Sequence, residues 1–183
     1  MRTALITAML AAASAGSLRA QAAQRHSPYA GQEMRSIKAL SDDELQGLRE
    51  GSGVGLATAA ELNHYPGPRH TLDLADSLHL SADQRIRLRA VYDSMHAPVV
   101  KLGESLIGAE ARMDSLFAAR RIDTSALAAL TRESARIKGE LRFTHLRAHL
   151  ATRAILTSEQ VSAYDRLRGY AGGAMDHAQH KHE

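Results

Sequence analysis

The sequence predicts an all-α protein built around a long antiparallel helical hairpin. In the second half of the chain, apolar residues recur in alternating steps of four and three, as on one face of an amphipathic helix. Aromatic residues make up only 4% of the chain, so few positions favour strands. One helix-start pattern occurs twice, once on each side of the predicted hairpin. These observations favour a hairpin domain over 80–170 with short flanking helices.

Residues 1–22 have the pattern of a cleaved secretory signal peptide. Arg2 precedes a short apolar run over 4–13, and the small-residue site Ala20-Gln21-Ala22 follows. The run is shorter than the roughly 18–20 residues that a membrane span needs. We therefore expect export to the periplasm, with Ala23 as the mature N-terminus.

Composition excludes several classes of function. The chain has no cysteine, which rules out disulfides, thiolate metal sites and a cysteine nucleophile. Removing Arg2 and Arg19 with the signal peptide leaves 21 basic against 20 acidic residues, from 23 against 20 in the full chain. This near balance, without a docking motif, argues against nucleic-acid binding. No nucleophile, base and orienting group occur together, so we predict that the protein is not an enzyme.

Residues 23–79 are predicted to form a polar segment followed by short helices. We expect one helix over 32–40 and a second from the capping box Ser41-Asp42-Asp43-Glu44 to near Gly51. Two more are expected over 56–63 and 72–78. The glycine run 51–55 follows a helix and lacks the Lys-Ser/Thr of a phosphate loop, so it does not predict nucleotide binding.

The hairpin itself is predicted from Ser81 to about Ala119 and back from Thr124, which can cap the return helix, to about Ile155. Pro98 lies within the first helix and predicts a kink there, because proline donates no backbone hydrogen bond. A short helix over 158–167 closes the domain. The remaining residues, 171–183, read as a disordered, His-rich tail.

The repeated helix-start pattern is Leu80-Ser81-Ala82-Asp83-Gln84 and Leu156-Thr157-Ser158-Glu159-Gln160. In each copy the hydroxyl residue can cap the helix, and the glutamine three residues later can reach back to it. The paired motifs (Leu80, Ser81, Gln84; Leu156, Thr157, Gln160) with a hairpin between them resemble the Leu-Thr-x-x-Gln repeat of the Spy/CpxP family of periplasmic stress proteins. The stretch 55–68 further resembles relatives described as periplasmic heavy-metal sensors or resistance proteins.

That resemblance implies a homodimer that binds unfolded or partly folded client proteins without ATP. On the return helix, an apolar stripe of Phe143, Leu146 and Leu150 is interleaved with Arg142 and Arg147. Such a surface suits unfolded chains, which offer apolar side chains and carboxylates. The alternative is that the stripe is a homodimer interface or packs under the short N-terminal helices.

Histidines suggest a second function, the binding of zinc, copper or nickel, although no cofactor is required by the sequence. His145 and His149 are one helical turn apart, and the hairpin register places His96 at the same level. The alternative is that all three are ordinary flank histidines. A separate candidate is the tail, with His177, His180 and His182. In this hypothesis the protein is a metal sensor or resistance protein whose state is read by a membrane-bound signalling partner.

Overall fold

The computed structural model describes residues 27–170, so the predicted signal peptide and His-rich tail lie outside the described residues. The chain divides into two units, one ending at Glu33 and one beginning at Met34. The described part of the first unit is a turn, in which the Ala30 and Gln32 amides donate to the Ser27 and Tyr29 carbonyls. The 3-10 helix η1 (Gln32–Met34) follows it.

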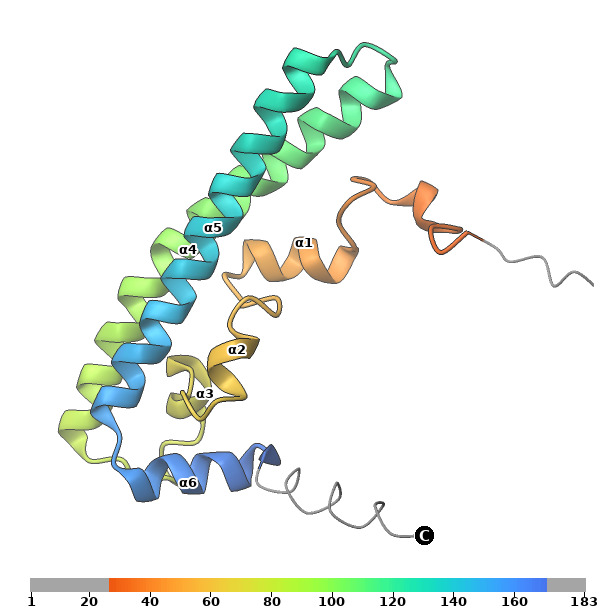
Figure 1. Cartoon of the computed structure of the whole chain (residues 1–183). Coiled ribbons are helices and arrows are strands. Elements are labelled where there is room, and N and C mark those ends of the chain that lie inside the picture. The colour runs from red at the N-terminus through yellow and green to blue at the C-terminus, as the bar shows by residue number, and fades with distance from the viewer. Residues whose placement is uncertain (1–26, 171–183) are drawn as a thin grey trace, which may run out of the picture. The chain divides into compact units, whose positions relative to one another are not determined.

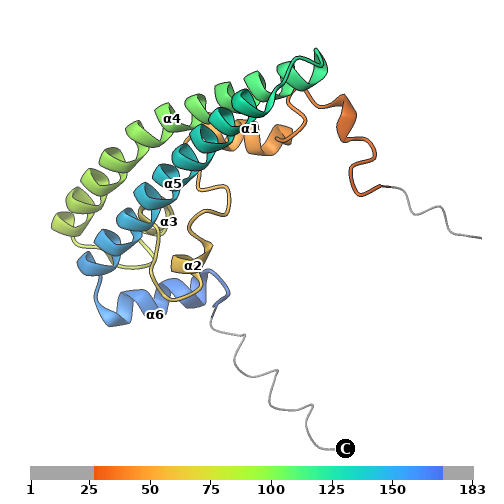
Figure 2. The ribbon, with the colours of Figure 1, turned by 45° about the horizontal axis from the view of Figure 1, so that its top comes forward.

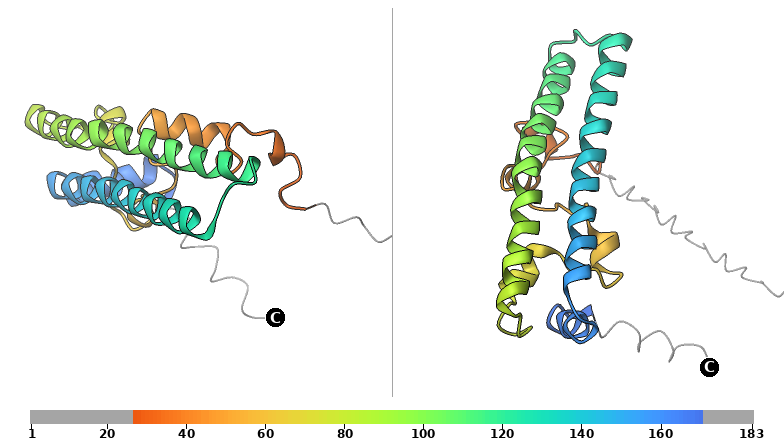
Figure 3. Two further views of the ribbon diagram at one scale, coloured as in Figure 1. Left: turned by 90° about the horizontal axis from the view of Figure 1, so that it is seen from above. Right: turned by 90° about the vertical axis from the view of Figure 1, so that its left-hand side faces the viewer.

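The second unit is all-α over its described residues, which confirms the predicted fold class. Its core is the hairpin of α4 (Ala82–Ala118) and α5 (Thr124–Ile155), which pack along each other in antiparallel directions (Figure 1). Three short helices, α1 (Asp42–Arg49), α2 (Thr58–Glu61) and α3 (Pro68–Asp73), lie on one side of this hairpin (Figure 3). Helix α6 (Ser158–Leu167) turns across its open end. None of the described helices combines the length and the apolar character needed to cross a bilayer.

Helix α4 runs through Pro98 without interruption. The hairpin bows gently along its length (Figure 2). The apolar seam continues in register on both sides of Pro98, with Met95 and Val99 both buried against α5, so packing holds the helix together where one backbone hydrogen bond is missing.

The helix starts agree with the sequence in three cases and differ in one. Ser41, Ser81 and Thr157 each form the predicted capping box with the residue three positions later. Helix α5, however, is capped by Asp123 and not by Thr124, since the Asp123 carboxylate accepts the Ala126 amide at 2.7 Å. Asp and Thr are both good caps, and only the turn geometry decides between neighbours.

The two glutamines of the repeated motif are hydrogen-bonded to each other. The Gln84 amide nitrogen donates to Gln160 Oε1 at 2.7 Å, and the Gln160 amide nitrogen donates to Gln84 Oε1 at 3.0 Å. Each also donates to a carbonyl at the foot of the hairpin, that of Ile155 or Leu78. The motif therefore caps two helices and fastens them together at the open end of the hairpin.

The N-terminal helices differ from the sequence prediction in three places. No helix spans 32–40; beyond η1 the chain turns, and Ile37 and Leu40 enter the core from irregular backbone. The helix expected over 72–78 lies earlier, as α3, because Pro68 occupies its first turn, where proline is well suited. The predicted helix over 56–63 is shorter, as α2.

Two apolar clusters hold the second unit together. The larger one joins α1 to the middle of the hairpin, and the smaller one packs α6 and the segment 72–80 at its open end. Leu156 and Val161, which flank the cap residue Thr157 in the positions of a hydrophobic staple, are both buried in the smaller cluster, as is Tyr164.

Candidate functional site

His145 and His149 are buried side by side on α5, with only 4% and 7% of their surfaces exposed. Their side chains lie on the face of the hairpin that carries the N-terminal helices, and residues 51–68 cover them. A cavity of about 380 Å³ lies between this segment, α4, α5 and the end of α6. Side chains from all four line it, including Glu61, Met95, His145, His149, Arg168 and Tyr170.

Glycines allow the covering segment to approach the histidine rings closely. A Cβ on Gly67 would lie 2.9 Å from His149 Cε1, and one on Gly51 would lie 3.1 Å from His96 Cδ2. Gly53 faces His145 at 4.0 Å on the same measure. The lack of side chains at these glycines therefore lets the backbone pack closely against the imidazole rings.

His149 is held in a defined orientation. Its Nδ1 lies 2.7 Å from the Tyr65 carbonyl oxygen, which can only accept a hydrogen bond, so this nitrogen carries the proton. In neutral His149, Nε2 then keeps its lone pair. A carbonyl oxygen that accepts from one ring nitrogen and so fixes the tautomer is usual for histidines that bind metals.

His145 is buried without a hydrogen-bond partner for its Nε2 among the described residues. Burial, and next the charge of His149, lower the pKa of His145 to about 4. The ring is therefore neutral at pH 7, the state in which imidazole binds metals. A buried nitrogen without a hydrogen-bond partner costs free energy, which makes His145 Nε2 a candidate for ligand binding.

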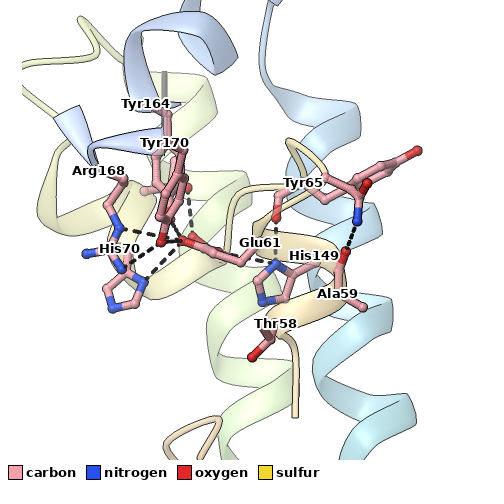
Figure 4. A network of polar contacts seen from close by, with 12 residues as sticks. Thr58, Ala59, Glu61, Tyr65, His70, His149, Tyr164, Arg168 and Tyr170 are labelled. Carbon is pink, nitrogen blue, oxygen red and sulfur yellow. Dashed lines mark hydrogen bonds and ion pairs between the residues drawn. The ribbon is translucent and has the colours of Figure 1, made fainter. Parts of the chain in front are cut away.

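Glu61 connects the histidines to the end of α6 (Figure 4). Its Oε1 accepts hydrogen bonds from the hydroxyls of Tyr164 and Tyr170, the latter at 3.2 Å, and lies 3.5 Å from Arg168 Nε. Its Oε2 lies 3.7 Å from His149 Nδ1. Burial and the bond to Glu61 raise the pKa of the Tyr164 hydroxyl, which stays protonated as the donor. One carboxylate thus joins α2, α5 and α6.

Glu61 and the tyrosines were not predicted as site residues. Glu61 ends a short Ala-rich helix, and nothing in its spacing relates it to α5 or α6. The only local signal is an acidic residue in front of the Pro66-Gly67-Pro68 turn.

The structure does not bring His96 together with His145 and His149. His96 Nε2 lies 3.0 Å from the Glu50 carbonyl oxygen, and its ring stacks on Tyr92. Within residues 27–170, no group of three or more His, Cys, Asp or Glu side chains is placed to hold one metal ion. The hairpin register predicted the position of His96 along the helix axis, but it did not predict that the segment around Gly51 packs against its ring. The tail histidines His177, His180 and His182 lie outside the described residues.

The apolar stripe is a surface feature. Phe143 and Leu150 are each 59% exposed, Leu146 is half-buried, and Arg142 and Arg147 are exposed. The Arg147 guanidinium lies 5.5 Å from the centre of the Phe143 ring. At about 100° per residue, this face lies roughly 110° around α5 from the histidines and nearly opposite the seam that packs on α4. Phe143 and Leu150 are therefore left uncovered by the N-terminal helices.

A hairpin of two long helices, capped and fastened by paired Leu-Ser/Thr-x-x-Gln motifs, defines a Spy/CpxP-like class of all-α proteins. The model of the heavy-metal resistance family matches residues 52–163, and the chain belongs to this family, which is the Spy/CpxP-like Leu-Thr-x-x-Gln family. It is a family of resistance and chaperone-like proteins, not of enzymes. No similar curated protein and no similar solved structure was found.

Proposed function

We propose that this protein is a periplasmic, ATP-independent chaperone that binds unfolded or partly folded client proteins on the exposed stripe of α5. The observation that carries the proposal is the exposure of Phe143 and Leu150, each 59%, beside Arg142 and Arg147. Contiguous apolar surface in a soluble protein usually marks a binding site. Family membership supports the proposal, since its members typically act in the periplasm.

The chemistry of the stripe fits unfolded chains. Large apolar side chains gain free energy by covering a client's exposed apolar groups, and the flanking guanidinium groups attract its carboxylates. Neither contact requires a particular client sequence. A homodimer interface on the same face is the competing explanation, and the test must separate the two.

The test replaces Phe143 and Leu150 together by Ser and measures how well the protein suppresses aggregation of an unrelated unfolded protein. Both side chains are mostly exposed, so the variant should fold, and suppression should be lost. Leu127→Ser, another exposed apolar position on α5, is the matched control. Light scattering gives the oligomeric state of each variant. Full suppression by a double variant that keeps its oligomeric state would overturn the proposal.

A second candidate function is the binding of zinc, nickel or copper(II) at His145 and His149. The observation that favours it is the buried Nε2 of His145, which has no partner among the described residues, beside a second imidazole of fixed tautomer, that of His149. Two neutral imidazoles suit these metals, with water in the remaining positions. A bound ion would tie the covering segment to α5, a change that a membrane-bound partner can read.

Isothermal titration with each metal tests this candidate. The His145→Ala/His149→Ala variant should lose the tight binding event, whereas His79→Asn should keep it. His79 is exposed, lies outside the cavity and has a positive φ of 48°, which asparagine tolerates. Equal affinity in the double variant would exclude the pair as ligands.

A further inference from the structure

Building on the second candidate function, we propose that the metal held by His145 and His149 is copper(I), with the thioether of Met95 as its third ligand. Met95 comes from α4, on the other arm of the hairpin, and lines the same cavity as the two histidines. From the sequence, only imidazoles were predicted as ligands at this site. The sulfur changes the class of metal ion that the site selects.

Met95 is level with the two histidines along the hairpin. It lies as far before the end of α4 as residue 147, midway between His145 and His149, lies after the start of α5. Met95 is buried in one core cluster with Ala148, which confirms this level. The hairpin register therefore does bring a third donor to the pair, but the donor is Met95 and not its neighbour His96.

Two imidazoles and a thioether suit copper(I) better than a divalent ion. Zinc binds four ligands in structural sites, and three protein ligands plus water in catalytic ones. Within residues 27–170, no group of three His, Cys, Asp or Glu side chains is placed to hold one ion, so zinc or nickel finds only two such ligands at the pair. Copper(I) is a soft ion that binds thioether sulfur and accepts a low coordination number. For this ion the three donors form a complete set.

The charges at the site favour a monovalent ion as well. The thioether and the two neutral imidazoles bring no negative charge of their own. The free energy cost of burying an ion rises with the square of its charge, so copper(I) enters this cavity at a lower cost than a divalent ion. The Glu61 carboxylate lies beside His149 Nδ1, at 3.7 Å, and not beside Nε2, the nitrogen that keeps a lone pair for a metal. Glu61 therefore contributes one negative charge near the site without being a ligand.

The experiment measures the affinities of the full chain for copper(I) and for zinc, by competition with a chromophoric chelator of each ion in oxygen-free buffer. Met95→Leu removes the sulfur and nearly keeps the side-chain volume, a change that buried positions usually tolerate. Copper(I) affinity should fall by at least about 10-fold, a loss that even outer-shell partners of a metal cause. Zinc affinity should stay the same, because zinc does not use the thioether. Met113→Leu, on the same helix but outside the cavity, is the matched control and should change neither.

X-ray absorption at the copper edge gives a readout that does not depend on affinity. The wild type, loaded with one equivalent of copper(I), should show sulfur as well as nitrogen bound to the ion. Met95→Leu should show nitrogen without sulfur, and Met113→Leu should match the wild type.

Three outcomes would overturn the inference. Unchanged copper(I) affinity in Met95→Leu, or a sulfur signal that persists there, excludes the thioether as a ligand; the second candidate function survives this outcome if His145→Ala/His149→Ala still loses metal binding. Equal losses of zinc and copper(I) affinity in Met95→Leu show that Met95 only shapes the cavity. If the double histidine variant binds every tested metal as tightly as the wild type, the candidate function and the inference fail together.

Discussion

At the scale of single residues, His145 is a buried polar group whose position stability does not explain. Among the described residues, its Nε2 has no hydrogen-bond partner, whereas Glu61 nearby faces donors from α5 and from the end of α6. A core designed for stability alone would place an apolar residue at 145. The contrast supports a binding role for the cavity.

His145 gives the apo protein a pH-dependent stability. Its pKa in the folded state, about 4, is below the ordinary value of 6.5, so the unfolded state binds the proton more readily. Its contribution is complete above pH 6.5 and is lost as the pH falls from about 6.5 to about 4. This amounts to on the order of 3 kcal/mol. Denaturant unfolding at several pH values should show a shallower decline for His145→Gln than for the wild type; parallel declines would contradict it.

At the scale of elements, α1 and α4 meet through a glycine. A Cβ on Gly103 would lie 2.2 Å from the Leu48 carbonyl oxygen, closer than any side chain allows. The contact brings Leu45 and Leu48 of α1 into the same cluster as Val99 and Leu106 of α4. This close packing holds α1 in position against α4, although α1 is a short helix.

Gly103→Ala should therefore force α1 away from α4 and destabilise the protein by about 1–3 kcal/mol. Gly139→Ala is the matched control: it is also inside a long helix, but its Cβ would meet nothing within 4 Å. There the higher helix propensity of alanine should be neutral or stabilise by up to about 1 kcal/mol. Thermal melts of the two variants decide, and equal melting temperatures would show that the α1 contact is not tight in solution.

At the scale of the second unit, the two copies of the motif act as one device. Gln84 and Gln160 are 76 residues apart in sequence. Each accepts a hydrogen bond from the backbone amide of its own cap residue, Ser81 or Thr157, and donates one to the other glutamine. The hairpin ends are thereby joined beside the small core cluster that contains Leu80, Leu156 and Tyr164.

The glutamine pair should behave non-additively. Gln84→Ala and Gln160→Ala each remove a cap bond and the mutual bonds, so each should cost about 1–2 kcal/mol, whereas the double variant should cost about 1 kcal/mol less than their sum. Gln46→Ala, on the exposed face of α1, should have little effect. Chemical denaturation of the three single variants and the double variant measures these free energies of unfolding. Simple additivity would mean that the two motifs cap independently.

The sequence by itself determined what depends on local and periodic signals. The hairpin, its capping boxes at Ser81 and Thr157, and the family follow from patterns that act within one helix turn or repeat regularly. It also placed His145 and His149 on a common face. The stripe at 143–150 was recognised in the same way, although its exposure was not.

Only the tertiary structure decided what covers each face of the hairpin. Segment 51–68 has little regular structure, and its course over His145 and His149 depends on close glycine contacts that no periodicity reveals. Because the sequence does not show this course, His96 was wrongly predicted to join the pair, and Glu61 was missed. Contacts between segments about 85 to 110 residues apart, such as Glu61 with Tyr164, arise from the packing of the whole unit, whose free energy is not local.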